Sequence, residues 1–156
     1  MSKNINLFVS HKGEDEGRID DFKNLMSTKG YTFRDSSIRE SDPNNANNKE
    51  YIKNSILKPA IDWAGKVVVL IGKETHKSEW VNWEIEYAIK KHYKIIGVFL
   101  PGEKEAELPE AIKDYGDGCV GWNSNKIDLA LKSDKPIWED ADGNPIAPNN
   151  PNRVTC

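Results

Sequence analysis

The stretch KVVVLIG, from Lys66 to Gly72, decides the fold. Every residue from Val67 to Ile71 is apolar, whereas a strand with one face in water alternates apolar and polar residues. An unbroken apolar run of this length, ended by a glycine, is typical of a central parallel strand that is covered on both faces. The run is also far too short to cross a bilayer, which takes about 20 apolar residues.

Strand and helix patterns alternate on both sides of this run. Further strands are predicted at Ile5–Ser10, Tyr31–Arg34, Lys94–Gly102 and Cys119–Trp122. Helices are predicted around Ile19, Phe22, Leu25 and Met26, from Lys49 to about Ile61, and from Lys77 to Lys91. Because the crossovers between parallel strands are right-handed, we expect an α/β fold with a parallel sheet of about five strands and helices on both faces.

Composition narrows the class of protein. The 156 residues carry a net charge of −3 and no basic stripe, so we expect no nucleic-acid partner. No stretch is long and apolar enough for a membrane span, and the N-terminus carries no secretory signal pattern. The two cysteines, Cys119 and Cys156, form no CxxC pair, and no His/Cys cluster has metal spacing. We therefore expect a cytoplasmic protein without a metal site.

The last part of the chain changes character. Residues 1–132 carry the strand and helix pattern, whereas the final segment includes DADGNPIAPNNPN, which is rich in Pro, Asn, Asp and Gly. We expect residues 133–156 to form an irregular appendage or a small hairpin.

Ligands of open parallel sheets bind beyond the carboxyl ends of the strands, where the strand order reverses. That rule directs attention to Ser10 and His11, to residues 35–38, to residues 72–76, and to the first turns of the Lys77–Lys91 helix.

This helix, KSEWVNWEIEYAIKK, contains one carboxylate whose position needs an explanation. Val81, Ile85 and Ala88 mark the apolar face, and Glu84 lies at the edge of that face. No cation stands three or four residues from Glu84, so the helix itself supplies no partner charge. Glu84 is either a half-exposed carboxylate that reaches solvent or a carboxylate in a partly dry pocket that acts on a bound cation.

Several segments resemble TIR domains. NLFVSHK is similar to their first strand and loop, GYTFRDSSI to the second strand, and YKIIGVFLPG to the strand after the central one. YIKNSILKPAIDWAGKVVVLIGKETHKSEWVNWEI is similar to the second helix, the central strand and the W-x-x-x-E motif of the NAD-cleaving site. The resemblance covers roughly Asn4 to Trp122 and points to the ThsB type of the Thoeris anti-phage system. The loop after Asp35 and the tail after Ser133 depart from the family pattern.

The resemblance implies a flavodoxin-like, TIR-type fold and an enzyme that takes NAD as its substrate and needs no cofactor. Glu84 matches the catalytic glutamate, and Trp80 begins its motif. The chemistry agrees, because nicotinamide leaves NAD as a neutral molecule. Ordinary glycosidases need a second carboxyl group to protonate the leaving oxygen. Here one carboxylate that grips the ribose and faces the developing positive charge can suffice.

Each further candidate for substrate binding also has a plain structural role. His11 is expected either to bind the ligand or to stand in a solvated loop, and Ser10 and Lys12, which flank it, could meet phosphates. Gly72 either lets a ligand approach the backbone or permits a turn. Asp35 and Ser36 either contact ribose or adenine or make turn hydrogen bonds. Phe33 could stack on a base or belong to the core. The aromatic residues Trp80, Trp83 and Tyr87 could wall the pocket or pack elsewhere.

By resemblance, the chain is an NAD glycohydrolase or ADP-ribosyl cyclase that makes a signalling nucleotide and so activates a separate effector. The product is a cyclic ADP-ribose isomer, a histidine conjugate or free ADP-ribose. Activation is expected to involve a homo-oligomer assembled through the loop from Asp35 to Asn48. Two alternatives are a non-catalytic TIR scaffold and a domain that binds ADP-ribose-type nucleotides without turnover.

Overall fold

A sheet of six parallel strands forms the centre of the molecule, in the order β2-β1-β3-β4-β5-β6. The computed structural model describes residues 5–12, 17–35 and 53–147. The strands are β1 (Ile5–Ser10), β2 (Tyr31–Asp35), β3 (Lys66–Ile71), β4 (Lys94–Phe99), β5 (Gly118–Val120) and β6 (Ile137–Trp138).

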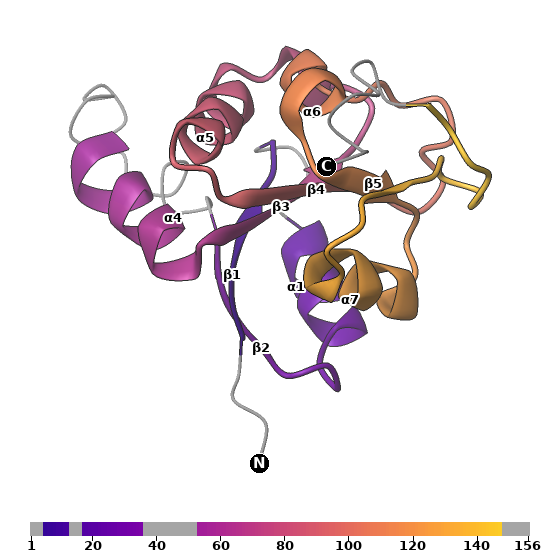
Figure 1. The fold of residues 1–156 in the computed structure, drawn as a ribbon, viewed down its shortest axis with the longest axis horizontal. Coiled ribbons are helices and arrows are strands. Elements are labelled where there is room, and N and C mark those ends of the chain that lie inside the picture. The colour runs from indigo at the N-terminus through magenta and orange to yellow at the C-terminus, as the bar shows by residue number, and fades with distance from the viewer. Residues whose placement is uncertain (1–4, 13–16, 36–52, 148–156) are drawn as a thin grey trace.

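Helices cover both faces of this sheet (Figure 1). One face carries α4 (Lys58–Ala64), α5 (Glu79–Lys90) and α6 (Glu110–Tyr115), and the other carries α1 (Arg18–Leu25) and α7 (Ser124–Lys132). A π-helical turn, η2 (Lys53–Leu57), leads into α4, and a short 3-10 turn, η3 (Thr75–Lys77), precedes α5. None of the helices among the described residues combines the length and apolar character needed to cross a membrane.

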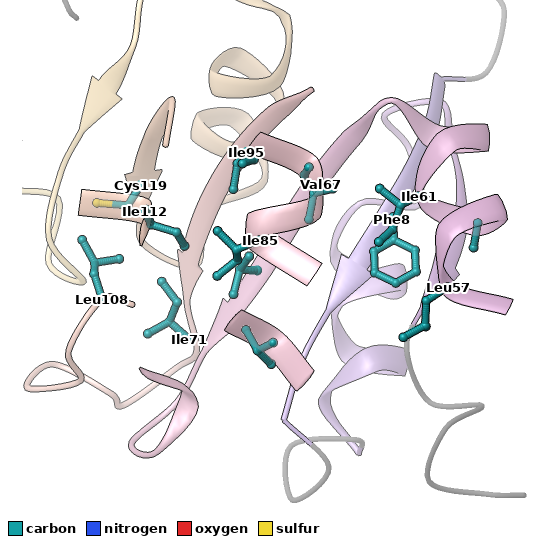
Figure 2. Packing of buried hydrophobic residues seen from close by; sticks show 14 of the residues in the cluster. Phe8, Leu57, Ile61, Val67, Ile71, Ile85, Ile95, Leu108, Ile112 and Cys119 are labelled. Carbon is teal, nitrogen blue, oxygen red and sulfur yellow. The ribbon is translucent and has the colours of Figure 1, made fainter. Parts of the chain in front are cut away.

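The central strand is β3, as its apolar run predicts. Val67, Val69 and Ile71 join the hydrophobic cluster under α4, α5 and α6, whereas Val68 and Leu70 join the cluster under α1 and α7. All five side chains are fully buried. Figure 2 shows the first cluster, which is built from both the sheet and the helices above it. The two covered faces explain why this strand lacks alternation.

The sheet has one strand more than expected. Ile137 and Trp138 lie in the segment for which we expected an appendage or a hairpin, and they pair in parallel with Gly118 and Cys119 of β5. After β6, Glu139 and Pro145 form an isolated antiparallel bridge. A strand of two residues is too short to show a period, so only the neighbouring strand reveals it.

Two helices also went unrecognised in the sequence. For α7 a signal exists, because Ile127, Ala130 and Leu131 have helical spacing and are buried. The helix α6 spans only Glu110 to Tyr115 and buries Ile112, which is too little for a periodic pattern. The predicted helix that begins at Lys49 is described only from Lys53 onward, where it runs to Ala64.

The strand order reverses beside β1. The chain passes from β1 to β2 on one side and then crosses to β3 on the other side of β1. In sheets of this kind, ligands bind in the crevice beyond the carboxyl ends of the two strands at such a reversal. Those ends are Ser10 on β1 and Ile71 on β3.

Candidate active site

A serine and a glutamate meet at this reversal. The Ser10 hydroxyl donates a hydrogen bond of 2.6 Å to Oε1 of Glu84, although the two residues are 74 positions apart. Neither residue has any exposed surface. Ser10 ends β1 in register with Val69, so its side chain points to the face that α5 covers. The pair therefore joins the first strand to the helix that follows the central strand.

Local sequence explains why α5 presents Glu84 inward. Ser78 caps the helix, and its side chain accepts a hydrogen bond of 3.2 Å from the Val81 amide. Val81, Ile85 and Ala88 are fully buried against the sheet, and Glu84 precedes Ile85 on the buried side. A half-exposed carboxylate, one of the two possibilities that the sequence left open, is therefore wrong. The buried face of α5 is wide enough to include Glu84 beside Val81, Ile85 and Ala88.

His11 is also buried, which excludes the solvated loop that we considered for it. Its Nδ1 lies 2.9 Å from the carbonyl oxygen of Lys12. Because a carbonyl can only accept a hydrogen bond, Nδ1 carries the proton in this contact. The two residues that follow one another at the end of β1 thus both place buried polar groups at the carboxyl edge of the sheet.

The turn after β3 is held by Thr75. The Gly72 amide donates a hydrogen bond of 2.7 Å to Oγ1 of Thr75, and that hydroxyl donates to the Leu70 carbonyl at 3.3 Å. Thr75 is fully buried. These bonds give the loop one conformation directly beside the end of β1.

Charged groups ring the outside of this edge. Lys77 lies 3.2 Å from Glu74 and, through a hydrogen bond and its charge, lowers the pKa of Glu74 below its ordinary value. The charges of His76 and Lys12 add smaller effects of the same sign to the pKa of Glu74. His76 Nε2 lies 3.5 Å from Glu107 and links the β3 loop to the loop after β4.

Two of the predicted binding residues lie away from Glu84. Phe33 packs edge-on against Phe22 with ring centres 5.9 Å apart, in the cluster on the α1 and α7 face. Asp35 is in register with Val9 on that same face and forms an ion pair of 3.4 Å with Lys23. Ser36 and the loop to Asn48 lie outside the described residues.

The aromatic residues of α5 divide into two groups. Trp80 is half-buried and packs against the cluster that contains Val81 and Ile85. Trp83 and Tyr87 stack on each other, with ring centres 5.6 Å apart and an interplanar angle of 13°. These two rings line a groove beside α4, whose lining does not include Glu84.

The described part of the chain shows neither a cluster of metal ligands nor a reactive cysteine thiol. Within residues 5–12, 17–35 and 53–147, no three His, Cys, Asp or Glu side chains are grouped closely enough to hold a metal ion. Burial raises the pKa of the Cys119 thiol to about 12, which keeps the sulfur protonated and a poor nucleophile. The buried pair formed by Ser10 and Glu84 is therefore the candidate active site.

A family model described as "Thoeris protein ThsB, TIR-like domain" matches residues 8–105, which is more than half of the chain. The chain belongs to this ThsB family of TIR-like domains. No curated protein matches the chain. The six-stranded parallel sheet between two helical layers agrees with the expected flavodoxin-like, TIR-type fold.

The segment that matches the ThsB family holds both halves of the site. It includes Ser10, His11, Gly72, Trp80 and Glu84, together with the carboxyl end of β1 and the whole of β3 on either side of the reversal. It ends before α6, so the family match does not extend to β5, α7 and β6. Sequence reasoning picked out Ser10 and Glu84 separately but missed their hydrogen bond, because no local pattern relates residues so far apart.

Proposed function

We propose that the chain is an NAD-cleaving enzyme of anti-phage defence, in which Glu84 is the catalytic carboxylate. One observation carries the proposal. Glu84, in the W-x-x-x-E helix of a ThsB-family domain, is fully buried and meets Ser10 at the point where ligands of this sheet type bind. A buried carboxylate that a fixed donor orients at such a point is a common mark of a catalytic site.

The reaction breaks the bond between the nicotinamide nitrogen and the ribose carbon. The bonding electrons stay with the ring nitrogen, which turns the positively charged pyridinium into neutral nicotinamide. Positive charge therefore develops on the ribose, and an adjacent carboxylate stabilises it more in the transition state than in the ground state. Ser10 is the positioning residue in this scheme, because its hydroxyl fixes Oε1 of Glu84.

Glu84 has no exposed surface in the state described here, so NAD can reach it only after neighbouring side chains rearrange. We therefore assign this state to a resting enzyme of low activity. Activation opens the carboxyl edge of the sheet above Ser10 and Glu84. The ribose hydroxyl groups of NAD then donate hydrogen bonds to the carboxylate of Glu84. In the resting state, the burial of Ser10 and Glu84 keeps water away from the carboxylate until the substrate is bound.

The product depends on what captures the ribose cation. Water gives ADP-ribose, a nitrogen of the same adenine gives a cyclic isomer, and the imidazole of free histidine gives a conjugate. In each case, the attacking group forms one bond to the ribose carbon. Water and imidazole each then release one proton, whereas attack by an adenine ring nitrogen transfers the positive charge to the adenine. We favour a signalling nucleotide, with the cyclic isomer ahead of the histidine conjugate, because Ser10 and Glu84 are fully buried and a site that excludes water lets a ring held beside the ribose compete with it. The product then diffuses through the cytoplasm to a separate effector.

The test measures nicotinamide release from NAD by purified protein, alone and with extract from phage-infected cells. Mass spectrometry of the same reactions, with and without added histidine, identifies the product. We expect release that depends on the infected extract and a product other than ADP-ribose. ADP-ribose alone under every activating condition would leave a plain NAD hydrolase. No release under any of these conditions, with NAD or ADP-ribose still bound, would favour the nucleotide-binding alternative.

A further inference from the structure

A groove of about 570 Å³ lies between α4 and α5. A volume of this size is typical of sites for small molecules. The residues that line it are Lys58, Trp83, Glu86, Tyr87, Lys90 and Lys91. Neither Ser10 nor Glu84 belongs to this lining, so the groove is separate from the candidate active site.

Two stacked rings form an aromatic wall of the groove. The rings of Trp83 and Tyr87 are nearly parallel, and the hydroxyl of Tyr87 donates to both oxygens of Asp62, at 2.9 and 3.0 Å. Tyr93 donates to the same carboxylate at 2.8 Å. Burial and the bond to Asp62 raise the pKa of Tyr87 to about 12, so its hydroxyl stays protonated, and the hydrogen bonds to Asp62 restrain the ring. This arrangement holds a flat aromatic platform in place.

Lysine side chains surround the platform. The ammonium group of Lys53 lies 5.4 Å from the centre of the Trp83 ring, and those of Lys58 and Lys91 each lie 5.7 Å from the centre of the Tyr87 ring. Contacts of this kind are weak at exposed sites, at about 0.5–1 kcal/mol each. The rings thus hold the ammonium groups close together without neutralising them.

Among the described residues, the lysines around the groove outnumber the carboxylates beside them. Within the described ranges, none of Lys53, Lys58, Lys90 and Lys91 forms an ion pair with a carboxylate. The lining contains one carboxylate, that of Glu86, against three lysines. The carboxylate of Asp62 accepts hydrogen bonds from the two tyrosine hydroxyls. The groove is therefore a concentrated positive field beside a flat aromatic surface.

We propose that this groove is a second ligand site, which binds a molecule that combines a planar ring with several negative charges, as a nucleoside triphosphate does. The base stacks on the platform of Trp83 and Tyr87, since every nucleobase has a face suited to such stacking. The phosphates draw the lysine ammonium groups away from the rings, because a lysine binds phosphate as a point charge. An acidic peptide would satisfy the charges but not the platform, so we favour the nucleotide.

The test uses full-length protein carrying Glu84→Gln, so that binding is measured without any turnover. Calorimetric titration with ATP is compared with titrations with inorganic tripolyphosphate and with oligoglutamate. We expect saturable ATP binding at about 1 mM or below, weaker binding of both other probes, and a loss of affinity as salt is raised. Because turnover is already removed, the result is independent of the proposed NAD cleavage.

Paired variants locate the site. Lys58→Ala with Lys91→Ala should weaken ATP binding by roughly tenfold or more, as expected for two lost charge contacts near the surface. Lys104→Ala with Lys113→Ala removes the same charge elsewhere and should change ATP affinity by less than about twofold. Lys53→Ala with Lys90→Ala provides a second groove pair should the first pair alter the thermal melt.

Several outcomes would overturn the inference. Absence of ATP binding, or equal losses in the groove and control pairs, would exclude a nucleotide site here. Tripolyphosphate binding as tightly as ATP would show that the rings take no part, and tighter binding of oligoglutamate would assign the groove to an acidic protein segment. A loss of ATP binding caused by Ser10→Ala and not by the groove variants would move the site to the carboxyl edge.

Discussion

Replacing Glu84 with glutamine tests the catalytic assignment most directly. The substitution keeps the size and polarity of the side chain and removes the charge that, in the proposed reaction, faces the developing ribose cation. Loss of one fixed electrostatic contact in an active site typically costs about 100- to 1,000-fold in rate. We therefore expect nicotinamide release by activated protein to fall by at least about 100-fold.

The same substitution makes a second, opposite prediction for stability. The bond of 2.6 Å from Ser10 changes from a charged to a neutral acceptor, which weakens it by about 1 kcal/mol. Against this, the desolvation of a fully buried carboxylate is only partly offset by its hydrogen bonds, and the remainder, which is also about 1 kcal/mol or slightly more, is a cost that the amide avoids. The free energy of unfolding should stay the same or rise slightly, and a gain of about 1 kcal/mol corresponds to a rise in Tm of roughly 2–4 °C.

Glu86→Gln is the matched control. Glu86 lies on the same helix, is exposed, and loses the same unit of charge. Nicotinamide release is followed by chromatography and Tm by differential scanning fluorimetry. Full turnover in the Glu84→Gln protein would refute the catalytic assignment. A large fall in Tm without loss of turnover would show instead that the carboxylate is structural.

Three further changes test other parts of the molecule. Ser10→Ala removes the donor from a buried carboxylate, so we expect about 1–3 kcal/mol less stability in chemical denaturation and about tenfold slower nicotinamide release; unchanged values would mean that the bond has no importance. Gly97→Ala places a Cβ 2.6 Å from Cδ1 of Ile71, so the same denaturation assay should show a loss of about 1–3 kcal/mol, whereas Gly17→Ala, with nothing within 4 Å, should be nearly neutral. Burial and a bond to Asp62 of α4 raise the pKa of Tyr87 to about 12, so the folded protein keeps a proton that the unfolded chain releases above the ordinary tyrosine pKa of 10.0. Stability should therefore fall as pH rises from 10 to 12, and Tyr87→Phe should reduce that fall in thermal melts recorded across this range.

The central strand β3 and the helix α5, which holds Glu84, were predictable from local sequence patterns. The side chains from Val67 to Ile71 are all apolar and can be buried only if both faces of the strand are covered. This run is the central strand of the sheet. The helix expected from Lys77 to Lys91 runs from Glu79 to Lys90, because the spacing of Val81, Ile85 and Ala88 and the cap at Ser78 act within a few residues. Such short-range signals survive in almost any tertiary setting.

Elements without a local period were not predictable in the same way. The two residues of β6 form a strand because β5 offers them unpaired backbone groups at the sheet edge. Two residues are too few to show the alternation from which a strand is predicted. The same limit applies to Phe33 and Asp35, whose place on the α1 face follows from their register with Leu7 and Val9.

By itself, the sequence determined the type of fold, the motif that holds Glu84 and the edge of the sheet at which ligands of this fold bind. Only the tertiary structure decided that Glu84 is buried and that Ser10 is its hydrogen-bond donor. The physical reason is that the helical period specifies which residues share a face, but not the rotation and depth at which the sheet receives that face. Here the receiving surface is the end of β1, and it lies 74 residues away in the chain.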